Sequence, residues 1–487
     1  MEKPDNETRD AEAVGSGRDR PVSGANFAQF NPLAVYVVAF LCFAAFLAVS
    51  NGFRWDWIPE HVTPFYAMYY RQPPNIFFLF PVVFGALFIA MLVLVFKGKM
   101  RVRPGYLLCI LVVCGTVLHL LVAMIDGGPE AISATFRRWD YEYFGDVPFV
   151  LNPIQFLRDY VDLMAHPRAL SMHSRVHPPG PVLMLWFITL FTGRDPLAAS
   201  MGSVAVSNLT IVPLYYFVRR VFGDKAALYS VLLYLFAPTV VMFTATSVDT
   251  FFCLFTAGSL CFFAAAMERD SRLSAALAGL SFALAILMSF NIGILGLFFA
   301  VVGVKYLANR ENRAKTFQCL AIMAGVFILF HVLAFGVGYN VFDCFAQASA
   351  QLRTDVINQD LYTPRAPYII WRLGTPIAVL FFAGIPVAGL FALWIRRGIS
   401  GNNPLSTVRD GAAYYFGFLA TLIVFDLLYF GRGEGERAWV FLLPFIITPA
   451  GALMAHRIAK PDAVLLWTLG VTFVQTFVME ALLFTYW

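Results

Sequence analysis

Charged residues are scarce in this chain of 487 residues. Asp, Glu, Lys and Arg together make up 13% of the sequence, whereas hydrophobic residues make up 59% and the mean hydropathy is +0.70. An ordinary soluble domain carries roughly a quarter charged residues, so a water-soluble globular protein is excluded. Several apolar runs approach the roughly 20 residues that cross a hydrocarbon core about 30 Å thick, and they predict membrane-spanning helices. Examples are Pro32 to Ser50, Ile76 to Phe96, Leu228 to Thr246 and Phe317 to Gly338.

Cysteine is also sparse, with seven residues in the whole chain. Their spacing forms neither a disulfide framework nor a zinc motif, which excludes a disulfide-stapled secreted module and a zinc-binding domain. Cys344 stands alone in a predicted loop. The other six lie in or near apolar runs: Cys42, Cys109, Cys114, Cys253, Cys261 and Cys319.

The N-terminal segment lacks the basic start and cleavage site of a secretory signal peptide. Residues 1–31 are polar and mix acids with bases, so they are predicted to form a disordered cytoplasmic tail. Residues 32–487 show no internal repeat and no low-complexity tract, and they are predicted to form a single transmembrane domain. The net charge of +5 reflects basic residues retained on the cytoplasmic side, and it indicates no nucleic-acid partner.

Basic residues cluster in short connections between the apolar runs, and this pattern orients the chain. Lys97 to Arg103 crowd one connection and Arg310 to Lys315 crowd another, so both are predicted to be cytoplasmic. This orientation requires that Val182 to Thr192, which is too short for a span, does not cross the membrane. The N-terminus is then inside, the C-terminus is outside, and about thirteen spans are expected. They lie near residues 33–51, 75–96, 105–125, 198–217, 226–245, 249–267, 273–290, 291–307, 317–338, 374–395, 411–430, 438–456 and 462–484.

The predicted architecture is an all-α polytopic membrane protein whose outer-face loops carry short interfacial helices. The main outer loop covers residues 125–197, and a second covers 339–373. Their aromatic and proline content favours packing against the membrane surface.

The main outer loop concentrates carboxylates, histidines and arginines. It reads Arg-Arg-Trp-Asp-Tyr-Glu-Tyr-Phe-Gly-Asp from Arg137 and His-Ser-Arg-Val-His-Pro-Pro-Gly from His173. Glycosyl transfer to a hydroxyl needs a carboxylate that accepts the proton of the acceptor, together with cationic or hydrogen-bonding groups that stabilise a departing phosphate. Both kinds of group occur in this one loop.

An acidic residue in a long outer loop, followed by His-Pro-Pro-Gly at the start of a short apolar helix, resembles the C-type (GT-C fold) glycosyltransferase superfamily. Its members depend on polyprenyl-phosphate sugars and include the protein O-mannosyltransferases, the aminoarabinose transferases of lipid A, the arabinosyltransferases and the oligosaccharyltransferases. Two weaker similarities agree. Asp249 follows a predicted span, and Gly433-Glu434-Gly435-Glu436-Arg437 forms a late outer loop.

The resemblance implies an inverting transferase that moves a hexosyl or pentosyl group from a polyprenyl-phosphate donor to an acceptor hydroxyl on the outer, periplasmic or lumenal face. The acceptor would be a glycan, lipid or protein, and the location a bacterial inner (plasma) membrane, in glycan biosynthesis for the cell envelope. Asp140 would be the general base, and Arg437 and His177 would stabilise the phosphate. The residues expected to bind substrate are Glu142, Asp146, His173, Asp249 and Glu434, together with Arg437 and His177. Some members use a divalent cation and others do not, so a metal stays open.

Alternatives remain at this stage. In the superfamily the catalytic acid usually follows the first span, so Asp56 competes with Asp140, although His-Pro-Pro-Gly follows the loop of Asp140. Asp249 would otherwise cap a helix. A polytopic transporter or flippase would use Asp426 and Glu480 inside predicted spans. The enzyme interpretation requires that Trp139 to Asp146 and His173 to Gly180 converge at one extracytoplasmic site.

Overall fold

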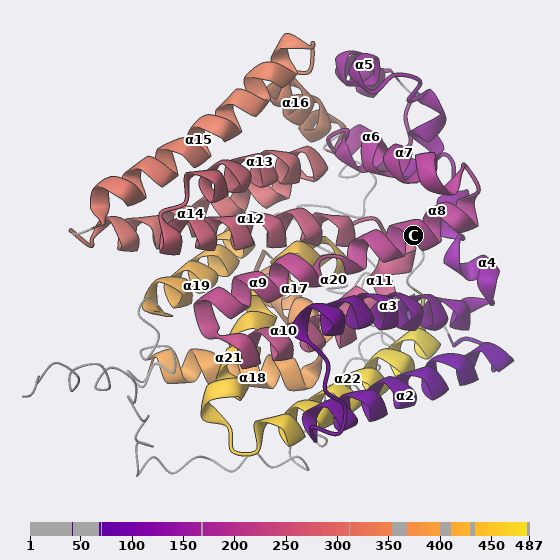
Figure 1. Ribbon diagram of the computed structural model, residues 1–487. Helices are drawn as coiled ribbons and strands as arrows, with labels where there is room; N and C mark the ends of the chain where they lie inside the picture. Colours follow the sequence, from indigo (N-terminus) through magenta and orange to yellow (C-terminus); the bar gives the residue numbers. More distant parts are fainter. Residues whose placement is uncertain are drawn as a thin grey trace, which may run out of the picture. The chain divides into compact units, whose positions relative to one another are not determined.

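A computed structural model describes residues 41, 68–69, 71–166, 169–310, 312–352, 368–399, 411–428 and 434–484. The predicted tail, most of the first predicted span and Asp56 lie outside these ranges. The described chain is almost entirely helical (Figure 1). Its one strand pairing joins β1 (Met68–Tyr69) to β2 (Leu483–Phe484), antiparallel over two residues. The all-α polytopic class is therefore confirmed.

Eight segments in the described ranges are long and apolar enough to cross a membrane. Most consist of one helix, and Pro196–Phe222 combines two. The helices that form them are α2 (Leu79–Phe96), α3 (Pro104–Ala123), α8 (Pro196–Asn208) with α9 (Ile211–Phe222), α12 (Thr250–Arg269), α14 (Leu295–Leu307), α15 (Arg313–Gly336), α21 (Pro444–Arg457) and α22 (Pro461–Leu482).

Two bent pairs raise the number of candidate spans to ten at most, so the predicted thirteen are not confirmed. The first pair is α10 (Asp224–Phe236) and α11 (Pro238–Thr246), bent by 52° where Pro238 begins the second helix. The second is α17 (Tyr368–Ala383) and α18 (Ile385–Ile399), bent by 117° at Gly384, whose φ is +107°. Hydropathy alone predicted a straight span over 374–395. Glycine permits this left-handed backbone conformation, and the chain turns there instead.

Two further predicted spans, 273–290 and 411–430, correspond to shorter apolar helices. These are α13 (Arg272–Met288) and α19 (Gly411–Leu427), with 17 residues each. At 1.5 Å per residue they are about 26 Å long, slightly less than the hydrocarbon core. α7 (Gly180–Thr192) is shorter still, with 13 residues and a length of about 20 Å.

Alternate connections carry the basic residues, and several contacts tie these connections together. Lys225 at the start of α10 pairs with Asp462 at the start of α22, with Nζ 3.3 Å from Oδ1. His456, in the last turn of α21, lies with Nε2 2.8 Å from the carbonyl oxygen of Phe222 at the end of α9. We call the connections 97–103, 223, 270–271, 308–310 with 312, and 458–460 the basic end.

The remaining connections meet at the opposite ends of the same helices, which we call the site end. The hydroxyl of Thr135 donates to the carbonyl of Thr246 at 3.1 Å. The thiol of Cys253 donates to the carbonyl of Val440 at 3.3 Å. The first bond joins the loop after α3 to the end of α11, and the second joins the start of α12 to the segment before α21.

Burial divides the helices into two groups. α10, α11, α12 and α21 are buried along nearly their whole length and form the core. α15 is peripheral, with only three buried residues among its 24. Its exposed side chains include Phe317, Leu333 and Phe335, each more than 60% exposed, so this helix presents an apolar surface to the lipid.

Candidate active site

The acidic segment of the main loop folds back on itself. Its last part is a short 3-10 helix, η5 (Tyr143–Phe149). A Cβ on Gly145 would lie 2.0 Å from the carbonyl oxygen of Trp139, so only glycine allows the reversal. Phe144 stacks on Phe136 with ring centroids 4.9 Å apart and contacts Trp139 at 5.7 Å. The reversal places Asp140 and Glu142 at a turn fixed by aromatic packing.

Asp146 joins the acidic segment to the histidine segment. Its carboxylate is 2% exposed and accepts hydrogen bonds from the backbone N–H of Ser171 at 2.9 Å and from the Ser171 hydroxyl at 2.6 Å. Burial raises the pKa of Asp146, and the bonds from Ser171 oppose that rise. These contacts hold the start of α6 (Met172–Val176) in place. Direct substrate binding by Asp146 stays a prediction.

The two segments lie side by side, as the sequence predicts. The backbone N–H of Met172 donates to the carbonyl of Asp140, and that of His173 donates to the carbonyl of Tyr141, both at 3.1 Å. The buried hydroxyl of Tyr160 meets the carbonyl of His177 at 3.0 Å and that of Ser174 at 2.7 Å. Tyr160 lies in α5 (Pro153–Ala165), so a third element of the loop fixes the turn before His-Pro-Pro-Gly.

Gly180 ends that motif and begins α7. A Cβ at this position would lie 2.2 Å from the carbonyl oxygen of Leu287, close to the end of α13. Pro178 and Pro179 before it are buried. The motif therefore serves as a close-packed joint between the main loop and the helix bundle.

The side chains of Glu142 and His173 contact each other at the centre of the two segments. The distance from Nδ1 of His173 to Oε2 of Glu142 is 3.1 Å, and Glu142 is 4% exposed. Two tyrosine rings flank the imidazole, with centroids at 4.8 Å for Tyr141 and 5.5 Å for Tyr143. The pair is thus held on both sides and is screened from bulk water.

Arg437 is the cation of the site and comes from the late loop. It lies in α20 (Gly435–Ala438), with Nη2 2.7 Å from Oε2 of Glu434 and Nε 3.2 Å from Oδ2 of Asp249. The Ser247 hydroxyl also donates to Oδ2 of Asp249, at 2.7 Å. The Thr239 hydroxyl donates to the carbonyl of Glu436 at 2.5 Å and ties α20 to α11. Two carboxylates therefore orient one guanidinium.

Electrostatic effects link the late loop to the histidine segment. Burial and the neighbouring charges of His173 and Arg437 lower the pKa of His177 to about 3, with Glu434 opposing. Burial raises the pKa of Tyr143 well above its usual range, and Asp249 and Glu142 add to that rise. At neutral pH His177 is therefore a neutral imidazole and Tyr143 keeps its proton.

The structure brings together most of the predicted site residues. The groups that act on one another are Glu142, His173, His177, Asp249, Glu434 and Arg437. Asp140 joins them through its backbone, and its side chain is exposed at the edge. Asp56 lies outside the described residues.

Sequence reasoning missed the two tyrosines that flank the imidazole of His173. Their signal was the alternation of Asp140, Tyr141, Glu142 and Tyr143, in which acids and phenols are interleaved. It was overlooked because aromatic residues are abundant throughout this chain.

The acidic side chains at the site are not arranged to bind a divalent cation. Asp249 and Glu434 are the acids that would converge on an ion, but the guanidinium of Arg437 lies against both carboxylates. Among the described residues, no group of three His, Cys, Asp or Glu side chains is placed to hold a metal. Arg437 supplies positive charge where an ion would otherwise supply it.

One of the two membrane acids that suggested a transporter is paired. Oδ1 of Asp426, in α19, lies 3.5 Å from Nη1 of Arg372. Glu480 in α22 is fully buried.

Comparison with known families gives one sequence match. Residues 176–335 match the family of dolichyl-phosphate-mannose-protein mannosyltransferases. This confirms the resemblance predicted from the sequence over about a third of the chain. The matched range begins at the histidine segment and contains His177, Gly180 and Asp249, whereas Asp140 and Arg437 lie outside it. No curated protein matches the chain significantly.

Several solved structures are similar in fold. ArnT from Cupriavidus metallidurans, with undecaprenyl phosphate bound, has 16% sequence identity and a TM-score of 0.45 over 70% of this chain. The oligosaccharyltransferase of Archaeoglobus fulgidus in complex with zinc and sulfate has 15% identity and a TM-score of 0.42 over 74%. AglB from the same organism, with an inhibitory peptide and a dolichol-phosphate, has 13% identity and a TM-score of 0.42 over 74%. This chain spans 60%, 53% and 55% of the length of those three chains.

Proposed function

We propose that this protein is an inverting membrane glycosyltransferase that moves a hexosyl or pentosyl group from a polyprenyl-phosphate donor to an acceptor hydroxyl. The observation that carries the proposal is the convergence of carboxylates, histidines and one arginine from three separate parts of the chain. These parts are the main loop, the Asp249 turn between α11 and α12, and the late loop that contains Arg437. The family match over residues 176–335 supports the same class of reaction.

In this reaction Asp140 accepts the proton of the acceptor hydroxyl. An exposed carboxylate at the edge of the site suits that role, because an acceptor that approaches from water reaches it first. The acceptor oxygen forms a bond to the anomeric carbon as the bond from that carbon to the phosphate oxygen breaks. The electron pair of the broken bond leaves with polyprenyl phosphate, and attack from the opposite side inverts the anomeric configuration.

Arg437 stabilises the departing phosphate. The guanidinium is already oriented by Asp249, which is 8% exposed, and the more exposed Glu434 is the partner that the phosphate displaces. A bidentate guanidinium–phosphate contact matches the geometry of both groups. His177 acts as a neutral N–H donor, because its pKa of about 3 leaves it uncharged at neutral pH. Glu142 holds His173 beside the sugar.

The positive-inside rule supports an outer-face location for the site. Lys97, Lys99, Arg310 and Arg313 all belong to connections at the basic end, and the acidic segment belongs to the other. If the basic end is cytoplasmic, the site faces the periplasm or lumen.

Transfer by reconstituted protein tests the proposal. Wild type, Asp140→Asn and the matched control Asp162→Asn, an exposed acid in α5 of the same loop, are placed in liposomes. Undecaprenyl phosphates that carry labelled mannose, glucose or arabinose serve as donors, with a cell-envelope extract as acceptor pool. Release of undecaprenyl phosphate and label in the acceptor fraction are measured. Loss of the base lowers transfer by roughly 100-fold or more.

The controls separate the possible outcomes. Asp162→Asn should transfer as wild type does, and all three proteins should give the same gel-filtration profile. Unchanged transfer by Asp140→Asn would remove this residue from the mechanism. If wild type moves intact donor across the bilayer and transfers no sugar, the protein is a flippase and the proposed enzyme activity is wrong.

A further inference from the structure

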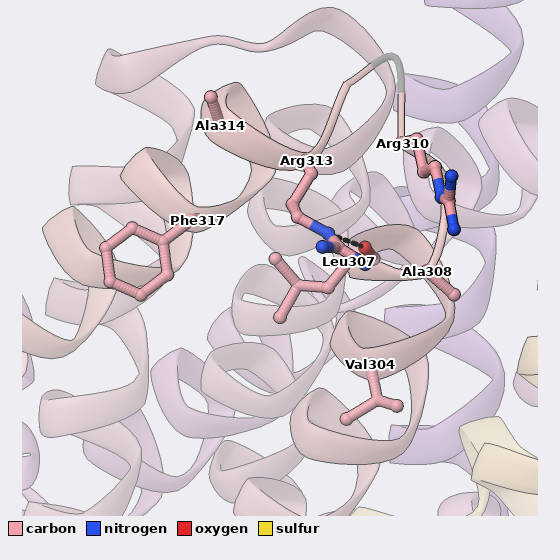
Figure 2. Close-up of a pocket in the computed structure, with 7 residues that line it drawn as sticks. All are labelled: Val304, Leu307, Ala308, Arg310, Arg313, Ala314 and Phe317. Carbon is pink, nitrogen blue, oxygen red and sulfur yellow. Dashed lines mark hydrogen bonds between the residues drawn. The ribbon is translucent and has the colours of Figure 1, made fainter.

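A surface hollow of about 820 Å³ lies at the basic end, between the end of α14 and the start of α15 (Figure 2). Its wall is mainly apolar and includes Val304, Leu307 and Phe317, with Arg310 and Arg313 at its edge. Figure 2 shows the two guanidinium groups above the apolar side chains of α14. Neither the proposed reaction nor the family match gives this hollow a role.

The apolar wall faces away from the protein. Val304 and Phe317 are each 65% exposed, although both lie in helices of membrane-spanning length and composition. Exposed apolar side chains at this depth are covered by lipid chains in a bilayer. The wall therefore suits an acyl chain that runs along α14 and α15.

The two arginines supply positive charge at the same place. Both are exposed, and Nε of Arg313 donates to the carbonyl oxygen of Leu307 at 2.9 Å, which orients its guanidinium over the hollow. Within the described ranges no carboxylate pairs with either arginine, whereas the nearby Lys315 lies 3.5 Å from Asp270. Glu311, between the two arginines, lies outside the described residues.

We propose that this hollow binds an anionic glycerophospholipid, with its phosphate and acidic headgroup on Arg310 and Arg313 and an acyl chain along the apolar wall. Guanidinium groups form charge-assisted hydrogen bonds with phosphate, and basic pockets between spans bind acidic headgroups. A free phosphate ion would leave the apolar wall bare. A zwitterionic lipid would bring its own cation next to the arginines. The proposal does not depend on the transferase activity.

Native mass spectrometry of the delipidated full chain in detergent tests the site. Dioleoyl phosphatidylglycerol is titrated against wild type, Arg310→Gln/Arg313→Gln, and the matched control Lys97→Gln/Lys99→Gln. The control removes two exposed cations from the α2–α3 connection, also at the basic end, and does not touch the hollow. We expect the arginine variant to bind phosphatidylglycerol about 30-fold more weakly, since each arginine near an acidic headgroup contributes roughly a factor of five. The control should bind as wild type does.

Two further arms identify the ligand. Dioleoyl phosphatidylcholine should bind wild type weakly and equally in all three proteins, and millimolar inorganic phosphate should leave bound phosphatidylglycerol in place. Equal loss in both variants would mean that the overall charge of the basic end binds lipid, and the hollow does not. If wild type binds phosphatidylglycerol and phosphatidylcholine with equal affinity, or if inorganic phosphate displaces bound phosphatidylglycerol, the proposal that an anionic phospholipid occupies the hollow is wrong. Matching gel-filtration profiles exclude misfolding as the cause of any loss.

Discussion

Burial keeps His177 neutral and Tyr143 protonated, and each protonation state limits what the residue does. Arg437 remains a cation because a guanidinium does not lose its proton in proteins. His177 is neutral at neutral pH, since burial, together with the neighbouring His173 and Arg437, lowers its pKa to about 3. Tyr143, whose pKa burial raises, keeps its proton and offers a hydroxyl. Among the described residues that contact one another here, Arg437 supplies a permanent positive charge beside the acids Asp249 and Glu434.

The neutral state of His177 makes the stability of the protein depend on pH. An unfolded histidine has a pKa near 6.5, so between about pH 6.5 and about pH 3 the unfolded chain binds a proton that the folded chain does not. Stability therefore falls as the pH falls through this window. At about pH 5 the loss reaches up to about 2 kcal/mol. His177→Gln should remove this loss, so the thermal midpoint of the variant should fall less than that of wild type between about pH 7.5 and about pH 5.

The matched control is His166→Gln, which changes an exposed histidine at the end of α5. Its thermal midpoint should follow wild type over the same interval, because that side chain lies in water. If His177→Gln and wild type lose the same stability on acidification, the imidazole of His177 is not held neutral.

For individual residues, the sequence was a better guide to which residues are in contact than to the role of each residue. The enzyme interpretation required the acidic segment and the histidine segment to converge, and the hydrogen bonds of Met172 and His173 show that these segments are in contact. The hydrogen bond from the Ser171 hydroxyl to the carboxylate of Asp146 did not follow, because the sequence of a loop gives no sign of the direction in which a carboxylate points. Side-chain orientation depends on packing between segments, which no local pattern records.

Among the elements, glycine and proline decide where helices begin, turn and approach one another. α11 begins at Pro238, the chain turns at Gly384, and α7 starts at Gly180 against the backbone of α13. The first two positions shape spans. The third connects the bundle to the loop that holds His177.

Gly180→Ala should disturb that connection. The new methyl group would meet the carbonyl oxygen of Leu287 at 2.2 Å, a backbone atom that moves only with α13. We expect a loss of about 1–3 kcal/mol in stability. Transfer should fall as well, since His177 lies three residues before the joint. Thermal unfolding and the liposome assay measure the two effects.

Gly325→Ala in α15 is the control for this substitution. Nothing lies within 4 Å of a Cβ there, and the backbone is helical, so transfer should stay as in wild type and stability should stay the same or rise by up to about 1 kcal/mol. If the Gly180→Ala protein is as stable and active as the Gly325→Ala protein, then α7 moves away from α13 without a loss of stability or activity, and the close contact at Gly180 is not required.

Element boundaries could be predicted where apolar runs end in basic residues. The predicted span 75–96 corresponds to Ile76–Phe96, and 105–125 to Pro104–Asp126. The bend of 117° in the region predicted as 374–395 could not be predicted in this way, because hydropathy counts apolar residues and ignores the direction of the chain. The short lengths of α13 and α19 were hidden for a similar reason, since apolar residues continue past the helix ends.

At the scale of the whole molecule, contacts between the predicted outer loops 125–197 and 339–373 limit how often the chain crosses the membrane between them. The number of crossings must be even if both loops lie on the same side. The thiol of Cys344 in α16 (Val341–Gln351) lies 3.6 Å from the sulfur of Met164 in α5, and the side-chain amide of Gln351 donates to the carbonyl of Met164 at 3.2 Å. Both loops therefore lie on one side of the membrane. Six helical passes separate α7 from α16, formed by α8 with α9, α10 with α11, α12, α13, α14 and α15. If each of these six passes crosses the membrane, α7 adds no crossing, because an even number of crossings returns the chain to its starting side.

Single-cysteine labelling tests this topology and the sidedness proposed for the site. If the site end faces outward, Asp162→Cys in α5 and Asp343→Cys in α16 should react with a membrane-impermeant maleimide from outside intact cells, because both positions are exposed. Lys99→Cys at the basic end should react only after the membrane is permeabilised. The native protein measures the background from its own cysteines. If Asp162→Cys and Asp343→Cys react from opposite sides, α7 crosses the membrane. If both react only after permeabilisation and Lys99→Cys reacts before, the site faces the cytoplasm, because the contacts between α5 and α16 hold in either orientation.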